Sequence, residues 1–203
     1  MFYRTIIFLE LVLLVFCTFY MINQTTIDAG ISDSFFSRGP SVAPLSMPAP
    51  TSIPIGIPIL ISIPRLQLEN VDIQEVTTDS FGKMGIPQDS FSLGWYRDGV
   101  RPGELGSAVL AGHYDMSTGA PAIFYNLHTI ELGDSIQIQD SNGMFFTFIV
   151  EEKKLYHFEE APIDTIFYRK DAKRLNLITC AGVWDVTQHN YNQRVVVYAR
   201  LVE

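Results

Sequence analysis

Cysteine and basic residues are both scarce in this sequence, and each shortage narrows the possible functions. The 203 residues include two cysteines, Cys17 in an N-terminal hydrophobic segment and Cys180 near the C-terminus, so the polar part of the chain cannot form an intramolecular disulfide. Lys and Arg number 14 against 22 Asp and Glu, which gives a formal net charge of -8. This charge disfavours binding to nucleic acid and electrostatic attachment to anionic lipid. Cys180 is therefore expected to be a free thiol.

Several familiar functional motifs are also missing. The sequence has no internal repeat, no phosphate-binding glycine loop and no paired-cysteine metal motif. A zinc site is conceivable, although the spacing does not demand it, from His113, Asp115, Cys180 and His189. A calcium site is a second alternative to a plain solvated surface, at Glu151, Glu152, Glu159 and Glu160. We predict that the protein uses no metal ion and no cofactor.

One long apolar run is present, at the N-terminus. Residues Thr5 to Ile22 form a run close in length to the minimum of about 17 residues for a membrane-spanning helix, and Glu10 is the one charged interruption. Arg4 precedes the run and the next basic residue is Arg38, so the positive-inside rule places the N-terminus in the cytoplasm and the rest outside. A cleaved signal peptide is the alternative, but no small-residue cleavage site follows the run. We predict that residues 1–27 form a cytoplasmic tip and a single-pass transmembrane signal-anchor.

The composition then changes to proline, serine, glycine and alanine. Seven prolines between Pro40 and Pro64 disfavour a continuous helix or a central strand. We predict that residues 28–58 form an extracellular linker and that residues 59–203 form one folded domain. Residues Ile59 to Ile63 are expected to be the point where the chain docks onto that domain.

Beyond Pro64 the pattern is that of short strands. Apolar runs and period-two alternation predict strands at residues 65–68, 71–76, 107–112, 135–139 and 145–150. Ser141-Asn142-Gly143 is a hairpin signal between the last two. Short helices are expected only around Pro121 to Leu127 and around Ile163 to Arg169. Many short strands with glycine turns favour a mainly β fold, either a closed barrel or a sandwich.

The reactive side chains gather around an apolar strand that ends on Cys180. Side chains alternate along a strand, so Cys180 and Ile178 share one face while Thr179 lies on the other. A lone cysteine is most often a small buried hydrophobe. Here a glycine-containing loop follows it, His113 closes another apolar run, and Arg194 opens the next strand. These are the parts of a nucleophilic site spread over three strands.

The same residues resemble the sortases, the cysteine transpeptidases of the Gram-positive cell surface. The similarity covers about Ile63 to Val202 and rests on Leu177-Ile178-Thr179-Cys180, on Ala111-Gly112-His113 and on the Arg194 strand. Smaller matches keep the family's order at Gly94-Trp95-Tyr96, Pro102 to His113, Phe124-Tyr125-Asn126-Leu127 and Leu132-Gly133-Asp134. The set is most similar to class F. Asn176 stands where many sortases carry threonine, which bears on subclass and substrate rather than on the chemistry.

The resemblance implies a closed sortase-like β-barrel of about eight strands with one or two short helices. It implies Cys180 as the nucleophile, His113 as the proton-transfer group and Arg194 as the oxyanion or substrate-backbone donor, for which a fixed guanidinium fork is well suited. From the residues alone, His189 is a serious alternative to His113 because it lies between Cys180 and Arg194 in the sequence. Three other side chains are weaker alternatives, namely His128, His157 and Arg200.

The implied reaction is cleavage of a Leu-Pro-x-Thr-Gly-like sorting signal at its Thr-Gly bond through a thioacyl enzyme. The acyl group would pass to an amine of a cell-wall precursor or to water. The stretch Tyr156 to Lys173 is expected to form the substrate-side wall, and the predicted substrate-binding residues are Thr179, Ile166, Phe167 and Tyr168. The alternatives are a cysteine endopeptidase that releases its product to water and a surface β-barrel that binds peptides or wall polymer without catalysis. The expected partners are sorting-signal peptides of surface proteins and the membrane.

Overall fold

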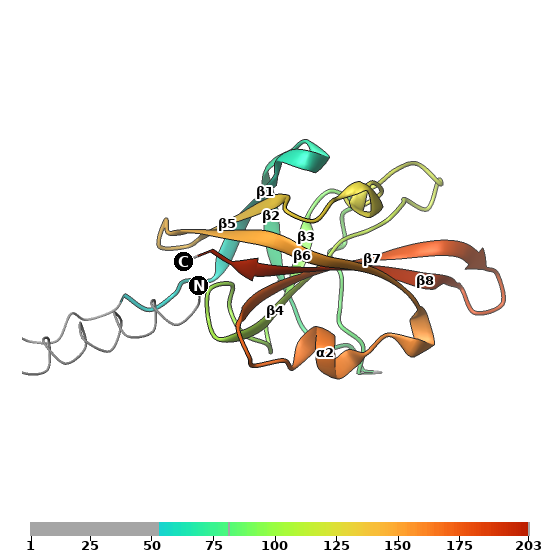
Figure 1. The fold of residues 1–203 in the computed structure, drawn as a ribbon. Coiled ribbons are helices and arrows are strands. Elements are labelled where there is room, and N and C mark those ends of the chain that lie inside the picture. Colours follow the sequence, from blue (N-terminus) through green and yellow to red (C-terminus); the bar gives the residue numbers. More distant parts are fainter. Residues whose placement is uncertain (1–52, 81, 203) are drawn as a thin grey trace, which may run out of the picture. The chain divides into compact units, whose positions relative to one another are not determined.

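The chain folds into a closed β-barrel (Figure 1). The computed structural model describes residues 53–80 and 82–202. Neighbouring strands follow the order β1-β2-β3-β4-β7-β8-β6-β5, and β5 pairs with β1 to complete the circle. The strands are β1 (Pro58–Ile63), β2 (Leu68–Val76), β3 (Leu93–Tyr96), β4 (Gly106–Ala111), β5 (Ser135–Asp140), β6 (Phe145–His157), β7 (Lys173–Asp185) and β8 (Asn190–Leu201). The prediction of a mainly β fold with a closed barrel of about eight strands is confirmed.

Within the part of the chain that the structure describes, helical structure is confined to short pieces in the connections. They are the 3-10 helices η1 (Pro64–Leu66), η2 (Leu127–Thr129) and η3 (Phe158–Glu160), and the α-helix α2 (Ile163–Phe167). No helix in residues 53–80 and 82–202 is long and apolar enough to cross a membrane. The predicted transmembrane segment and most of the predicted linker lie outside the described residues.

Two of the expected elements differ from the observed ones. The strand expected at residues 65–68 is wrong, because Pro64 opens η1 and Gln67 closes it with a left-handed φ of 58°. The fixed φ of proline favours such a turn over an extended start. The helix expected around Pro121 to Leu127 is reduced to turns followed by η2, whereas the one expected from Ile163 is present as α2.

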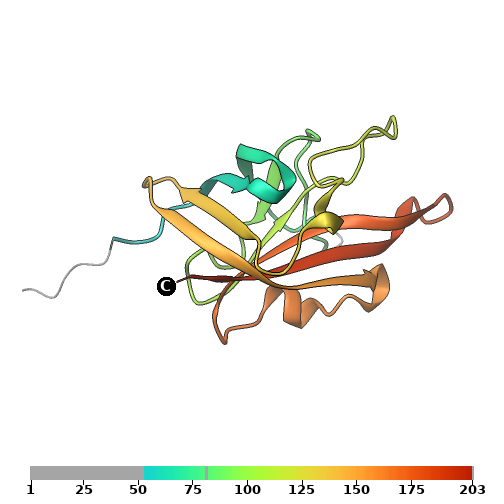
Figure 2. The ribbon, with the colours of Figure 1, turned by 45° about the horizontal axis from the view of Figure 1, so that its top comes forward.

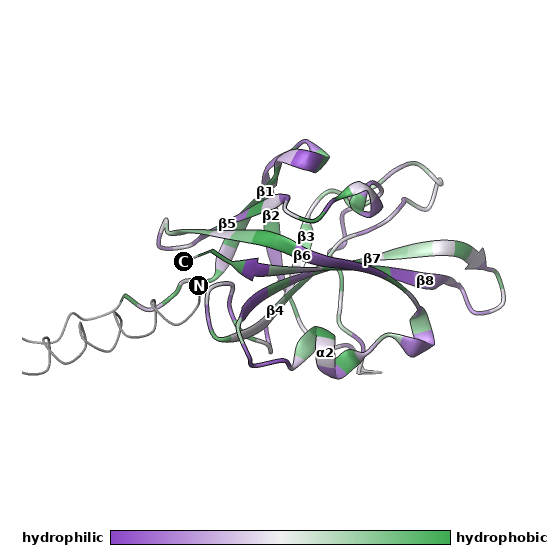
Figure 3. Cartoon of the chain, viewed as in Figure 1, coloured by the Kyte–Doolittle hydropathy of each residue, from purple (hydrophilic) through white to green (hydrophobic). Residues whose placement is uncertain are grey.

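Alternation along the strands sorts the apolar side chains into two clusters. The larger cluster fills the barrel with buried residues from every strand except β2, together with Phe124, Leu127 and Ile130 of the β4–β5 connection. Three partly buried residues of β2 pack against it, namely Leu68, Val71 and Ile73. The smaller one lies on the outer face of β4, β7 and β8, beneath α2, and its buried members are Val109, Ile166, Val196 and Tyr198. Figure 3 shows α2 with both hydrophobic and hydrophilic residues, as a helix with one buried face requires.

The chain before β1 is fixed to the turn between β5 and β6. Asp140, which is 1% exposed, accepts hydrogen bonds from the backbone N–H groups of Gly56 (2.7 Å), Asn142 (2.9 Å) and Met144 (2.8 Å). The Arg101 guanidinium adds a bond to the carbonyl oxygen preceding Gly56 (2.5 Å). One buried carboxylate therefore holds the hairpin turn and the entering chain together.

Candidate active site

Three neighbouring strands bring Cys180, Arg194 and His113 to one level of the barrel. Cys180 of β7 is the register partner of Arg194 of β8 in the antiparallel pairing. On the other side of β7, Ala111 of β4 pairs with Ile178 in a parallel register. Continuing this register by two residues along each segment places His113 next to Cys180. The strand register thus places at neighbouring positions the three residues that the sequence singled out.

The face on which Cys180 lies is set by strand alternation. Ile178 packs against the outer apolar cluster, so Cys180 also lies on the outer face of the barrel, half-buried. Thr179 is buried on the inner face, where its hydroxyl donates a hydrogen bond to the carbonyl oxygen of Gly112 (2.9 Å). Gly112 has no room for a side chain, because a Cβ there would lie 2.5 Å from a methyl carbon of Leu93. This close approach fixes the chain just before His113.

The imidazole of His113 is held by the connection between β2 and β3. Its Nε2 lies 3.0 Å from the carbonyl oxygen of Pro87. A carbonyl oxygen only accepts, so in this arrangement Nε2 carries the proton and Nδ1 is left to take up another. The connection is itself held by Asp89, whose carboxylate accepts the backbone N–H groups of Phe91 (2.9 Å) and Ser92 (2.7 Å). These hydrogen bonds, that of Phe91 first, lower the pKa of Asp89.

The Arg194 guanidinium is held along its own strand. Its Nη1 donates to the carbonyl oxygens of Tyr191 (2.9 Å) and Gln193 (2.7 Å), and its Nη2 donates to the side-chain oxygen of Asn190 (2.6 Å). The guanidinium carbon also lies 5.7 Å from the centre of the Phe158 ring, within range of a cation–π contact. The positive charge therefore has a fixed place opposite Cys180.

Burial dominates the electrostatics of the thiol. It raises the pKa of Cys180, the Arg194 guanidinium lowers it, and the Asp115 carboxylate raises it further. A thiol with a raised pKa holds little thiolate at neutral pH. The site therefore requires a base to remove the thiol proton when an electrophile is present, and His113 is the imidazole at the right level of the barrel.

A second group of side chains lies beyond Cys180, towards the β7–β8 hairpin, and we name it the acidic–aromatic patch: Tyr114, Asp115, Tyr125, Trp184 and Tyr191. The hydroxyl of Tyr191 donates to the Asp115 carboxylate, and this bond is the main reason that the pKa of Tyr191 is raised to about 12. Tyr114 stacks on Tyr125 with ring centres 4.9 Å apart, while Tyr191 meets Tyr114 and Trp184 edge-on at 5.4 and 5.3 Å.

Sequence reasoning named Asp115 only as a possible zinc ligand and missed the rest of this patch. The available signal was the spacing of Asp115 two residues after His113, which places both on one face of an extended chain. No group of three or more His, Cys, Asp or Glu side chains in residues 53–80 and 82–202 is arranged to hold a metal ion. The four side chains of the zinc alternative are therefore not gathered into one cluster.

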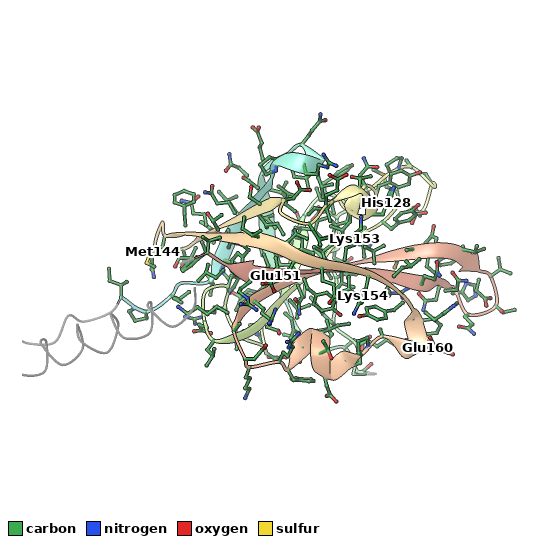
Figure 4. The ribbon with its side chains drawn as sticks, in the orientation of Figure 1. His128, Met144, Glu151, Lys153, Lys154 and Glu160 are labelled. Carbon is green, nitrogen blue, oxygen red and sulfur yellow. The ribbon has the colours of Figure 1, made fainter. Side chains whose placement is uncertain are left out.

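The other histidines lie in different surroundings from His113. His189 is exposed near the tip of the β7–β8 hairpin, with a left-handed φ of 48°. His157 is exposed at the end of β6 and pairs with Gln193. His128 lies near Lys153 in Figure 4, and the Lys153 ammonium donates to the carbonyl oxygens of His128 (2.5 Å) and Ile130 (2.7 Å).

Arg200 is further from Cys180 than Arg194 is. It bonds Glu151 of β6 (2.9 Å) and is the register partner of Arg174, near the start of β7. Figure 4 shows Glu151, Lys153 and Lys154 along β6, with Lys153 and Lys154 on opposite sides of the strand. Arg200 thus belongs to a surface ion-pair network and not to the surroundings of the thiol.

The predicted substrate-binding residues occupy different environments. Ile166 is 2% exposed within the outer apolar cluster, and its carbonyl oxygen accepts a hydrogen bond from the buried side chain of Asn176 (2.6 Å). Phe167 is half-buried and meets the Tyr96 ring edge-on at 5.5 Å, while Tyr168 is 58% exposed. Ile166 therefore anchors α2, and the two aromatic residues that follow it present surface.

A closed barrel with a thiol and a guanidinium on adjacent strands, and an imidazole just beyond the end of a third, is suited to thiol-dependent acyl transfer. A sequence profile of the sortase domain matches residues 61–202, more than half of the chain. The protein therefore belongs to the sortase family, whose members are cysteine transpeptidases.

Individual relatives agree with the family. Sortase D of Bacillus subtilis (strain 168) is 26% identical over 143 residues, which cover 70% of this chain and 63% of that protein, so the chain spans less than two thirds of this relative's length. Among solved structures, the sortase D5 transpeptidase of Clostridium perfringens has a TM-score of 0.53 at 23% identity, covering 73% of this chain and 79% of its own. A lid mutant of sortase A from Corynebacterium diphtheriae has a TM-score of 0.54 at 21% identity, covering 76% and 74%. The similarity to these solved structures shows that the chain shares their fold.

Proposed function

We propose that this protein cleaves a Leu-Pro-x-Thr-Gly-like sorting signal between Thr and Gly and passes the acyl group to an amine of a cell-wall precursor, or to water. The observation that carries the proposal is the common level of Cys180, His113 and Arg194 on three adjacent structural segments. A nucleophile, a proton-transfer group and a fixed cation within one face are what cysteine acyl transfer requires.

The first half of the reaction forms the thioacyl enzyme. His113 takes the proton of the Cys180 thiol, and the sulfur attacks the carbonyl carbon of the substrate threonine. The negative charge that develops on the carbonyl oxygen is stabilised by the guanidinium of Arg194. The C–N bond to glycine breaks, His113 returns its proton to the leaving amine, and a thioester to Cys180 remains. An incoming amine or water then attacks the thioester and displaces the thiolate.

The outer apolar cluster supports a wall for the acyl-donor peptide. We assign substrate contact to Phe167 and Tyr168, which have exposed surface, and an anchoring role to Ile166, which is buried. Thr179 faces the barrel interior and bonds Gly112, so we assign it a positioning role beside the nucleophile. The wall begins at α2 and lies over β4, β7 and β8.

The parts of the chain outside the described residues complete the proposal. We propose that residues 1–27 anchor the protein in the membrane with the N-terminus in the cytoplasm, that residues 28–58 form the linker and that residues 59–203 form the extracellular catalytic domain. Sortases are in general membrane-anchored extracellular enzymes, which supports this arrangement. Assignment to class F rests on the whole set of motif matches between Gly94 and Asp134 and stays a prediction.

The test is intact-mass spectrometry of the full chain in detergent, mixed with a sorting-signal peptide. We expect a mass increase equal to the acyl fragment, which Cys180→Ala abolishes, and release of the glycine-bearing fragment. Added glycinamide should convert the hydrolysis product into the amide. Release to water alone, whatever the amine concentration, would instead identify an endopeptidase. Peptide binding without any cleavage would identify a binding module.

A further inference from the structure

Cys180 lies between two surfaces of different chemistry. On the α2 side lies the outer apolar cluster, with Ile178 and Phe167 at its margin. On the side of the β7–β8 hairpin lies the acidic–aromatic patch, in which Tyr191 and Asp115 meet. Figure 2 shows this hairpin extending beyond the barrel. A two-step acyl transfer uses two substrates in turn at one sulfur, so a site with two unlike flanks offers a separate place for each.

The patch is held in place from both of its sides. Beyond His113 the chain returns on itself, with Phe124 N–H bonded to the His113 carbonyl (2.9 Å) and a β-bridge between Asp115 and Pro121. From the other side, the β7–β8 ladder is bulged between Ala181 and Trp184, and Tyr191 is the register partner of Trp184. The Tyr191 hydroxyl then closes the patch onto Asp115.

The side chains of the patch are of the kinds that bind a small organic cation. The Tyr191 hydroxyl takes up one acceptor position of Asp115, and a carboxylate has about four. Three tyrosine rings and the indole of Trp184, which is 47% exposed, contact one another in a continuous aromatic cluster, and Tyr191 joins this cluster to Asp115. Aromatic faces attract ammonium groups, and a carboxylate adds direct charge complementarity. Asp115 is also near enough to Cys180 to act on the thiol electrostatically.

We propose that the acidic–aromatic patch binds the acceptor substrate as its primary ammonium form, with Asp115 facing the charged nitrogen and Trp184 and Tyr191 covering its carbon chain. This inference rests on the proposed transpeptidase function and names the site of its second substrate. The bound ammonium loses one proton to neutral His113 and becomes the free amine. Its lone pair then forms a C–N bond to the thioester carbon and the C–S bond breaks. The second proton of the attacking nitrogen passes to the departing sulfur, which restores the Cys180 thiol, and His113 releases the first proton to water.

The experiment compares the rates at which two nucleophiles, added separately, react with the same thioacyl enzyme. The full chain is acylated with a sorting-signal peptide and offered either glycinamide, which is largely cationic at neutral pH, or hydroxylamine, which is largely uncharged there. In Asp115→Asn the Tyr191 hydroxyl keeps an acceptor oxygen while the charge is lost. We expect the KM for glycinamide to rise about five- to tenfold and the hydroxylamine reaction to stay within about twofold of the wild type.

Two further variants make the comparison decisive. Trp184→Ala should raise the KM for glycinamide alone, by about two- to fivefold, and it changes an exposed residue without removing core packing. Glu160→Gln, on η3, removes the same charge from an exposed side chain and should leave both reactions unchanged.

The outcomes separate this inference from the function on which it rests. Normal acylation with an unchanged glycinamide KM in Asp115→Asn would overturn the acceptor site alone. An equal loss with glycinamide and hydroxylamine would also overturn it, because Asp115 would then affect a step common to both nucleophiles and not the binding of the cation. Absence of any thioacyl enzyme in the wild type would overturn the proposed function and this site with it.

Discussion

The hydroxyl of Thr179 donates a hydrogen bond to the carbonyl oxygen of Gly112 at 2.9 Å, and each of these residues immediately precedes a reactive side chain. Gly112 leads to His113 and Thr179 leads to Cys180. The Gly112 N–H also donates to the carbonyl oxygen of Ile178 (3.1 Å). Two hydrogen bonds therefore fix the offset between the imidazole-bearing and thiol-bearing segments.

Thr179→Val should lower kcat for peptide cleavage several-fold with little change in KM. Valine keeps the shape but leaves the Gly112 carbonyl without its side-chain partner, which should also lower the free energy of unfolding by about 1–2 kcal/mol. Steady-state kinetics and urea denaturation measure the two effects. The exposed Thr77→Val is the matched control. A rise in KM at constant kcat would show instead that Thr179 contacts the peptide.

His113→Ala should lose nearly all acylation activity, whereas His189→Ala should retain most of it. Positioned acid–base catalysis contributes about 100- to 10,000-fold, and His113 is the histidine at the level of Cys180. Single-turnover formation of the thioacyl enzyme measures the difference. Equal losses in the two variants, or a larger loss in His189→Ala, would reverse the assignment.

Arg194→Lys should be nearly as damaging as Arg194→Ala, although lysine keeps the positive charge. The guanidinium uses its two terminal nitrogens at once, on Tyr191, Gln193 and Asn190, and an ammonium on a flexible stem cannot reproduce that fork. Loss of an oxyanion donor costs about 100- to 1,000-fold in the chemical step. Alkylation of Cys180 by iodoacetamide develops no oxyanion and should change much less. If acylation and alkylation fell together, Arg194 would be acting on the thiolate.

The alkylation rate of Cys180 should rise with pH later than that of an ordinary thiol. The thiolate is the reactive form, and burial raises the pKa of Cys180, so the midpoint of the profile moves to higher pH. Asp115→Asn removes a charge that raises this pKa and should move the midpoint to lower pH. Arg194→Gln removes a charge that lowers it and should move the midpoint to higher pH. Shifts of the opposite sign would contradict the electrostatic account of the site.

Asp140→Ala should lower the free energy of unfolding by about 2–4 kcal/mol. The change leaves three backbone N–H groups, those of Gly56, Asn142 and Met144, without their acceptor, and hydrogen bonds to a charged group are worth about 1.5–3 kcal/mol each before rearrangement. Urea denaturation measures the loss, and hydrogen exchange should rise at Gly56. The exposed Asp72→Ala is the control. A loss below about 0.5 kcal/mol would show that water replaces the carboxylate.

Local patterns in the sequence were enough to locate the strand ending on Cys180, the apolar run before His113 and the hairpin turn at residues 141–143. These features depend on neighbours in sequence, which alternation and turn chemistry report directly. The pairing of Asp115 with Tyr191 joins residues 76 positions apart and depends on the bulge in the β7–β8 ladder. No local pattern encodes such a contact.

The wall near α2 was predicted as a segment but not in its detail. The sequence predicts an apolar peptide-binding surface at Ile163, Ile166, Phe167 and Tyr168. In the structure Ile166 is buried. Ile166 is buried because α2 packs on the outer apolar cluster, and the Asn176 amide of β7 donates to the Ile166 carbonyl oxygen at 2.6 Å. Asn176 was recognised from the sequence as a departure from other sortases, but its partner could be known only once β7 and α2 were placed.

The polypeptide enters the barrel before β1 and leaves it after β8 at the same end of the barrel. Before β1, the carbonyl oxygen of Ile57 accepts a bond from Ser141 (2.8 Å), and after β8, Val202 donates to Thr147 (2.8 Å), so both ends lie beside the β5–β6 hairpin. Arg194 precedes Leu201 by seven residues of β8, or roughly 23 Å of extended strand. A bead, dye or fused cargo attached near either of these ends would therefore be remote from the thiol. The domain is built in a way that suits its use as an immobilised peptide-ligation reagent that can be washed free of product and reused.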